Sequence, residues 1–318
     1  MAASGVVLMT DHGSAEGSRA LLERAVEIVT GVPPSAVDAR HFLPGAGGTT
    51  STDRDGFHLD VPAAGFGATP ATLVVYEIPP ADRAGFAPFL RRLPRALRWG
   101  ADPRAWARAS DKRRTVATFR RHGIAHMETV ALRRPDGDRA VAAFERLGRD
   151  VWARPAVGAG GADVFHLTTP RQVRAAVGYY ADTGQAWLMS RDASNVDGRG
   201  RRHQFRVVVL YDRVLRVCEH VQDDPDAPCN EAKGAVSTVL PVEDLPLAYR
   251  QLAVAATRSL GLPYGGVDLA VEGGGAVFEV NVHPVLDVPG GLESMALPLA
   301  EAWCRAGRPA RALDAGRP

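Results

Sequence analysis

Hydrophobic and polar positions along this chain predict a succession of strands and helices. The short apolar runs Gly5–Met9 and Thr72–Ile78 predict buried strands, whereas apolar residues recur with helical spacing over Glu16–Val29. A strand, a helix and a strand in this order predict a small α/β unit over about residues 1–100. Residues 44–70 are rich in Gly, Thr, Asp and Pro, and we expect loops and a short hairpin there.

The remainder of the chain mixes both periodicities, which predicts an α/β (α+β) fold. Ser110 is expected to cap a helix that has Asp111 in its first turn and ends at Gly123. Residues 305–318 are expected to form a loose tail. Helical spacing predicts helices at Lys112–Arg121, Arg171–Tyr180 and Leu247–Leu260. Apolar or alternating segments predict strands at Val151–Pro155, Val164–Leu167, Gln204–Leu210, Val214–His220, Gly266–Val271 and Ala276–Val280.

The overall composition is that of a globular chain with a sizeable core. The 318 residues are 46% hydrophobic, and the formal net charge is only +2, so charge favours neither a nucleic acid nor an anionic membrane as a partner. No apolar run reaches about 18 residues, and the first ten residues lack the features of a signal peptide. The three cysteines are odd in number and are not at metal-ligand spacing, which favours a reducing, cytoplasmic location.

The basic residues are distributed very unevenly between the two types. The sequence has 36 Arg and only two Lys, Lys112 and Lys233, which is typical of coding bias in a high-GC bacterium. A lysine that persists in such a chain is a candidate functional residue. The Arg-rich stretch Arg83–Arg108 has helical spacing, and we interpret it as a solvated face or a dimer contact.

An acidic hairpin near the C-terminus carries the strongest chemical signal. The segment Gly266–Pro284 places Asp268 within one apolar strand, and Glu279 and Asn281 two residues apart on the next. Side chains two residues apart in a strand point to the same face, and the hairpin can bring Asp268 beside them. Two carboxylates and an amide oxygen predict a magnesium site, since a cation offsets the repulsion between the acids.

A Gly-rich loop follows the strand that ends at Arg154. Gly158, Gly160 and Gly161 would let backbone N–H groups approach phosphate oxygens closely. The loop is not a Walker A motif, because no Gly-Lys-Ser/Thr follows it. Taken alone, it is compatible with a plain hairpin turn.

These two segments, in this order and about 110 residues apart, resemble the ATP-grasp superfamily, and within it the branch of glutathione synthetase and the RimK-type glutamate ligases. Arg154-Pro155 through Val164 is similar to the family's phosphate loop, and Asp268 with Glu279-Val280-Asn281 is similar to its magnesium motif. The resemblance implies an ATP-grasp fold preceded by a pre-ATP-grasp α/β domain, and it implies ATP and Mg2+ as cofactors.

Further residues take roles from the same resemblance. It implies that Lys112 and Arg154 contact phosphates, that Ser190 and Asp192 form the adenine hinge, and that Arg206 and Asn230 are catalytic. The chain departs from the family in having Arg154 where the family has Lys, and in the atypical hinge from Ser190 to Asp192.

A third departure concerns the substrate side of the site. Glu219-His220 replaces a substrate-binding Arg of the family, and the family's Arg-x-Asn motif becomes Pro228-Cys229-Asn230. These differences leave the identity of the carboxylate substrate open.

The resemblance also implies the domain organisation and the activity. We expect a pre-ATP-grasp domain over residues 1–105, a small subdomain with the phosphate loop over 106–187, and a large subdomain with the metal site over 188–318. The implied enzyme is an ATP-dependent carboxylate–amine ligase that forms an amide or peptide bond through an acyl phosphate, with natural-product biosynthesis as one setting. Its partners would be a small carboxylate and an amine (an amino acid or peptide), and the family favours a homo-oligomer such as a dimer.

Two alternatives stay open. The first is an ATP-grasp kinase that phosphorylates a small acid or alcohol, and the second is a degenerate nucleotide-binding accessory protein. His203, His220 and His283 are candidate bases, but we interpret each as a surface or structural residue. Arg199, Arg201 and Arg202 are interpreted as a mobile loop near the substrate entrance.

Overall fold

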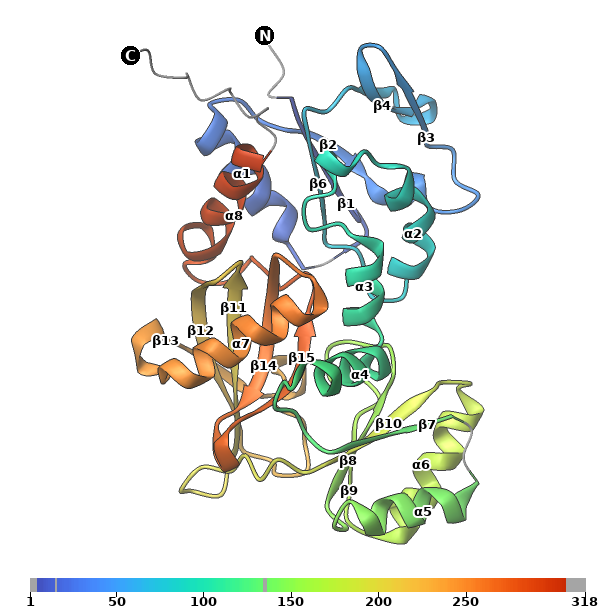
Figure 1. Cartoon of the computed structure of the whole chain (residues 1–318), viewed down its shortest axis with the longest axis vertical. Helices are drawn as coiled ribbons and strands as arrows, with labels where there is room; N and C mark the ends of the chain where they lie inside the picture. The colour runs from blue at the N-terminus through green and yellow to red at the C-terminus, as the bar shows by residue number, and fades with distance from the viewer. Residues whose placement is uncertain (1–4, 15, 134–135, 307–318) are drawn as a thin grey trace, which may run out of the picture. The chain divides into compact units, whose positions relative to one another are not determined.

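The computed structural model describes residues 5–14, 16–133 and 136–306 (Figure 1). The chain divides into two compact units, unit 1 with Met1–Pro103 and Val285–Pro318, and unit 2 with Arg104–Pro284. Among the described residues, no helix combines the length and the apolar character needed to span a membrane.

The sheet of unit 1 is parallel and follows the predicted strand, helix and strand. Its order is β2 (Ser35–Asp38), β1 (Val6–Thr10) and β6 (Thr72–Tyr76), and α1 (Ser18–Thr30) connects β1 to β2. All five residues of β1 are buried, as expected for a strand covered on both faces.

The end of the chain returns to unit 1, which differs from the predicted domain 188–318. Helix α8 (Leu297–Ala306) packs against α1 because both present apolar faces, and Leu299 and Trp303 of α8 are buried. The predicted loose tail begins inside this helix, and its residues 307–318 lie outside the described residues.

One further expectation for unit 1 differs from the structure. Residues 44–70 contain an antiparallel sheet of three strands instead of loops and one hairpin, in the order β3 (Thr49–Asp53), β4 (Gly56–Val61) and β5 (Phe66–Ala68). Alternate residues of β4 are buried, so a short apolar stripe is enough to hold this sheet. The Arg-rich stretch forms α2 (Arg83–Arg92) and, from the end of unit 1 into unit 2, α3 (Pro103–Ser110), and Arg91 and Arg92 at the end of α2 are exposed, as expected for a solvated face.

The first sheet of unit 2 is antiparallel and has helices on one face. Its order is β7 (Thr129–Leu132), β10 (Trp187–Arg191), β8 (Val151–Pro155) and β9 (Phe165–Leu167). Helices α5 (Gly137–Arg146) and α6 (Pro170–Asp182) cover the face formed by alternate strand residues such as Val151 and Ala153 (Figure 1). Trp152 and Arg154 alternate with Val151 and Ala153 along β8 and therefore point to the opposite face.

The second sheet of unit 2 has five antiparallel strands. Its order is β13 (Val236–Leu240), β12 (Arg213–Gln222), β11 (Arg202–Leu210), β14 (Tyr264–Ala270) and β15 (Ala276–Asn281). Helix α7 (Leu247–Leu260) packs on one face through Ala253, Ala256 and Leu260. The other face carries the charged residues of the next section.

Helix α4 (Lys112–His122) begins at the predicted residue, but its N-cap is the residue that follows the predicted cap. Asp111 is the N-cap, and its carboxylate accepts a hydrogen bond from the backbone N–H of Arg113 at 3.0 Å. Ser110 instead ends α3. Ser110 and Asp111 both have side chains that can cap a helix, and the longer Asp111 carboxylate is the one that reaches the free N–H. Gly123 ends α4 in the left-handed conformation, as predicted.

Candidate active site

A cavity of about 140 Å³ lies within unit 2. Its walls come from the helix-free face of the four-stranded sheet, from α4, and from the charged face of the five-stranded sheet. It is lined by most of the residues that the sequence points to, namely Lys112, Arg154, Gly158, Gly160, Gly161, Ser190, Asn230, Asp268 and Glu279.

A row of charged residues crosses three strands of the five-stranded sheet. Arg206 of β11 is in register with Asp268 of β14, which is in register with Glu279 of β15. Arg206 donates to both carboxylate oxygens of Asp268, from Nε to Oδ1 at 2.5 Å and from Nη2 to Oδ2 at 2.9 Å. We refer to Arg206, Asp268 and Glu279 as the carboxylate row. Its side chains share one face because in-register residues of paired strands do so.

Asn281 joins this row from the next position on the same face of β15. Its amide nitrogen donates to Asp268 Oδ2 at 3.3 Å, which leaves the amide oxygen as a further donor atom for a cation. The set of two carboxylates and an amide oxygen suits Mg2+, which prefers oxygen ligands. The residues present therefore fit a magnesium ion.

Lys112 connects the carboxylate row to the Gly-rich loop. It lies at the start of α4, and its Nζ is 3.2 Å from Glu279 Oε2 and donates to the carbonyl oxygen of Gly158 at 3.0 Å. The side chain is 12% exposed, so the ammonium group is largely shielded from water. One lysine thus holds a predicted metal ligand and the phosphate loop together.

Arg154 is a buried cation at the end of β8. Its Nε has no hydrogen-bond partner among the described residues. Burial lowers the pKa of its guanidinium, and the nearby carboxylates of Glu279 and Asp268 oppose this shift. A buried guanidinium with an unsatisfied donor beside two acids is arranged to receive an anion.

Glu279 is held in its ionised form by its neighbours. Burial would raise the pKa of its carboxyl group, but Lys112 first and then Arg154 outweigh burial, and the pKa lies below its ordinary value. The carboxylate is therefore charged near neutral pH.

The Gly-rich loop approaches the segment Pro228–Lys233 closely. Gly160 and Gly161 both have φ of +67°, in the left-handed region that favours glycine. A Cβ at Gly161 would lie 3.2 Å from Pro228 and 3.3 Å from Lys233, whereas a Cβ at Gly160 would meet nothing within 4 Å. The loop therefore needs glycine at position 161 for contact as well as for conformation.

The other end of the cavity is lined by an aromatic and cationic pair that the sequence did not point to. The Arg202 guanidinium lies 4.9 Å from the Trp152 ring centroid, and the His166 ring stacks on Trp152 at 4.6 Å. Asp192 accepts from Trp152 Nε1 at 2.7 Å and from Arg202 Nη1 at 2.7 Å. We refer to Trp152, Arg202, His166, Asp192 and Asp150 as the tryptophan cluster.

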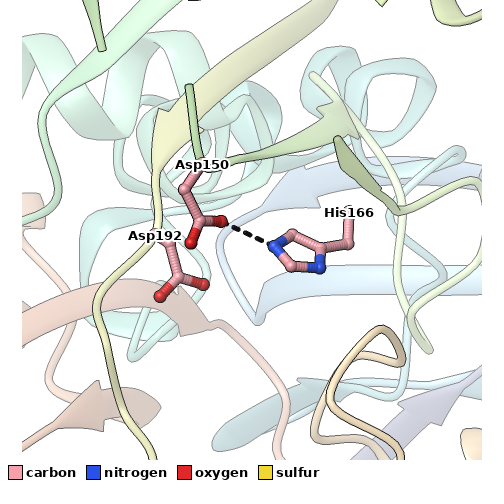
Figure 2. Close-up of side chains that lie close together, drawn as sticks. All are labelled: Asp150, His166 and Asp192. Atoms are coloured by element: carbon pink, nitrogen blue, oxygen red, sulfur yellow. Dashed lines mark hydrogen bonds and ion pairs between the residues drawn. The ribbon is translucent and has the colours of Figure 1, made fainter. Parts of the chain in front are cut away.

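Figure 2 shows three members of this cluster, with the Asp150 carboxylate directed at the His166 ring and Asp192 beside it. Their ligand atoms lie within 4.8 Å of one another, close enough to hold a metal ion. However, the His166 nitrogens are bound by Asp150 and Asp226 at 2.6 Å each, and the Arg202 cation already neutralises Asp192. These contacts explain the cluster as a structural network that fixes the Trp152 ring.

Three predicted site residues do not line the cavity. Arg206 and Asn281 lie directly behind it, since both bind Asp268. Asp192 turns away from the cavity toward Trp152 and Arg202, while its neighbour Ser190 lines it.

The interpretation of Arg202 as part of a mobile loop is wrong. Arg202 begins β11 and is 5% exposed, because Asp192 and the Trp152 ring lie against it. Two other lining residues also escaped notice in the sequence, Met127 and Phe278. Alternation along Ala276–Asn281 would direct Phe278 away from the face of Glu279, but the strand pairing shifts register there and leaves Phe278 without a paired residue on β14. Both residues line the cavity, and an apolar residue in a strand carries no chemical signal of its own.

The three candidate histidines occupy different environments. His203 lies between Glu219 and Glu272, at 2.8 and 2.6 Å, and although burial opposes it, these acids raise its pKa. His283 is buried and packs edge-on against Trp106. His220 is also buried, but neither of its ring nitrogens has a hydrogen-bond partner among the described residues.

Comparison with known families identifies one match that covers more than half of the chain. The model of the RimK-like ATP-grasp domain matches residues 109–290. A probable alpha-L-glutamate ligase of Enterobacter sp. (strain 638) is 26% identical over 184 residues, which are 58% of this chain and 59% of the relative. The chain thus matches less than two thirds of the length of this curated relative.

Solved structures extend the similarity to nearly the whole chain. The D-cycloserine synthetase DcsG has a TM-score of 0.68 at 19% identity, covering 95% of this chain and 99% of that one. The ATP-grasp ligase PsnB, complexed with minimal precursor, Mg and ADP, has a TM-score of 0.63 at 18% identity, covering 96% of this chain and 98% of that one. At these identities, the likeness establishes the fold.

Proposed function

The chain belongs to the RimK-like ATP-grasp family, and from that premise we propose that it is an ATP-dependent ligase that joins a carboxylate to an amine. The observation that carries the proposal is the arrangement of the carboxylate row opposite Lys112, Arg154 and the Gly-rich loop around one cavity. Acids that suit a cation and bases that suit phosphates share this space, as the transfer of a phosphoryl group from ATP requires.

The proposed reaction has two steps. A carboxylate oxygen of the first substrate attacks the γ-phosphorus of ATP, which releases ADP and gives an acyl phosphate. An amine then attacks the acyl carbon, and the C–O bond to phosphate breaks, so that an amide and phosphate form. The acyl phosphate is needed because a free carboxylate is a poor acyl donor.

Different residues of this chain have different roles in the first step. Lys112, Arg154 and the backbone N–H groups of the Gly-rich loop position the triphosphate. Asp268, Glu279 and Asn281 would hold a magnesium ion, which when bound supplies positive charge against the phosphate oxygens. The Arg206 guanidinium stabilises charge on the transferred group, and its donors are already aligned by Asp268.

The aromatic end of the cavity suits the adenine ring. The Trp152 indole and the backbone around Ser190 line this end, and Trp152 is fixed by His166 and Asp192. A planar base can pack against such a surface at little cost in side-chain order. We place the reaction in the cytoplasm, where ATP is abundant and where the three cysteines, which form no disulfide among the described residues, remain reduced.

An assay with hydroxylamine tests the proposal. The protein is incubated with ATP, Mg2+, hydroxylamine and single carboxylic acids, beginning with L-glutamate because of the names of the curated relatives. We expect ADP, phosphate and an acyl hydroxamate in equal amounts. A stable phosphorylated product without hydroxamate would instead identify a kinase, and no magnesium-dependent ATP binding would contradict the proposal.

A further inference from the structure

His220 is a buried histidine on the same sheet face as the carboxylate row. Its side chain is 7% exposed, and neither ring nitrogen meets a donor or acceptor among the described residues. Buried polar groups nearly always have a partner, because leaving one unsatisfied lowers stability. The unpaired imidazole therefore needs an explanation beyond folding.

The position of His220 places it next to the reacting groups. On β12 it is in register with Gln204 of β11, which lines the cavity, and Arg206 is in register with Cys218 of the same strand. His220 and Arg206 are therefore diagonal neighbours on one face, with Cα atoms about 7–8 Å apart. His203, by contrast, lies on β11 between residues of this face and so points to the opposite face.

The segment that follows β12 folds back over this part of the sheet. Gln222 Nε2 donates to the carbonyl oxygen of Lys233 at 2.8 Å, which ties the segment to β12. Cys229 and Asn230 of the same segment line the cavity. His220 is thus in register with Gln204, a lining residue of the sheet, and two residues from Gln222, which holds the segment.

The charges around His220 keep its imidazole neutral. Burial lowers its pKa most, Arg206 lowers it further, and Asp268 and Glu231 act in the opposite direction. Of its other neighbours on the sheet face, Arg202 carries a charge that Asp192 balances, whereas Gln204, Cys218, Gln222 and Ser237 carry none when Cys218 is a thiol. A neutral imidazole has one nitrogen free to accept a proton.

We propose that His220 accepts the proton that the substrate ammonium group loses before it attacks the acyl phosphate. This inference rests on the proposed ligase activity and assigns a residue to the proton transfer in the second step of that reaction. The ammonium N–H bond breaks and its proton moves to a His220 ring nitrogen, then to solvent. The freed electron pair forms the C–N bond, the C–O bond to phosphate breaks, and the second amine proton leaves with phosphate as hydrogen phosphate.

Other groups beside the cavity are poorly suited to this task. Burial raises the pKa of the Cys229 thiol to about 12, so it remains protonated. Glu279 and Asp268 are engaged by Lys112 and Arg206. Among the described residues of this region, His220 therefore combines a free acceptor atom with a position beside Arg206.

The test compares two nucleophiles on one variant. With the acid that the hydroxamate assay selects, and with the amine that gives an amide in a screen of amino acids beginning with L-glutamate, we expect His220→Gln to lower amide formation about 10²–10³-fold. Hydroxylamine is unprotonated near neutral pH and needs no proton removed before it attacks, so hydroxamate formation should change by less than about threefold. His203→Gln is the matched control, since its ring nitrogens are bound by acids on the opposite face.

Equal losses in both reactions would overturn the assignment and make His220 a structural residue. Amide formation by His220→Gln that stays within about threefold of wild type would also overturn the assignment. A separate measurement needs no substrate: histidine side-chain NMR of the wild type, assigned with His220→Gln, should show a neutral ring at neutral pH. An imidazolium there would also overturn the inference. Failure of the wild type to form any hydroxamate would count against the ligase activity itself.

Discussion

The carboxylate row and the tryptophan cluster each contain a buried carboxylate paired with a guanidinium group, Asp268 with Arg206 and Asp192 with Arg202, yet they differ in what remains unsatisfied around them. In the cluster, Asp192, Trp152 and His166 all have partners with good geometry. Beside the row, Arg154 Nε and both nitrogens of His220 have none among the described residues. Ion pairs alone therefore do not mark a reactive site, whereas unsatisfied polar atoms next to a cavity do.

Removing charge from the carboxylate row should have the largest effect on activity. We expect Asp268→Asn, and separately Glu279→Gln, to lower kcat/KM for ATP about 10³-fold, because charge on the transferred phosphoryl group loses its counterpart. The measurement is ADP release at saturating Mg2+, with thermal unfolding as a check of the fold.

Glu219→Gln is the matched control, because Glu219 lies in the same sheet on the opposite face. More than about a tenth of wild-type kcat/KM in Asp268→Asn would contradict the role of the row in phosphoryl transfer.

Removing charge from the tryptophan cluster should instead affect stability. Asp192 and Arg202 have side chains that are 5% and 6% exposed, so Asp192→Asn leaves a buried cation without its counter-charge. We expect the free energy of unfolding to fall by about 3 kcal/mol. Urea titration followed by circular dichroism measures this change.

The neighbouring pair of Arg191 and Glu128 provides a control with half-exposed side chains. Glu128→Gln should cost less than about 1 kcal/mol, because solvent screens the pair. Zinc should leave the unfolding midpoint of the wild type unchanged. A zinc-dependent rise that is lost in Asp150→Asn would show that the cluster is a metal site.

Two glycines of the phosphate loop allow a further comparison, for which we expect a smaller effect on activity. Gly160 and Gly161 have the same φ of +67°, so alanine strains the backbone similarly at both positions. Only a Cβ at Gly161 also meets Pro228 and Lys233. We expect Gly161→Ala to lower kcat/KM for ATP about tenfold more than Gly160→Ala, measured by ADP release. Equal losses would show that the contact with Pro228–Lys233 has no part in ATP use.

Local sequence carried enough information for the main elements and for the assembly of the carboxylate row. Alternation in two strands and one Gly-rich turn are enough to bring Asp268 opposite Glu279. The tryptophan cluster was not predictable in this way, because Trp152 and Arg202 are 50 positions apart and lie in different sheets. A run of arginines is typical of a solvated loop. The local sequence does not show that the Trp152 ring and the Asp192 carboxylate bury one of them, Arg202.

The path of the chain has a consequence for the order in which the protein forms during synthesis. Helix α8 packs on α1, Leu286 N donates to Ser18 Oγ at 3.1 Å, and yet the whole of unit 2 separates these partners in the sequence. Because a chain emerges from the ribosome N-terminus first, the apolar face of α1 is made long before its cover. Unit 1 is therefore complete only after the residues of α8 have been synthesised.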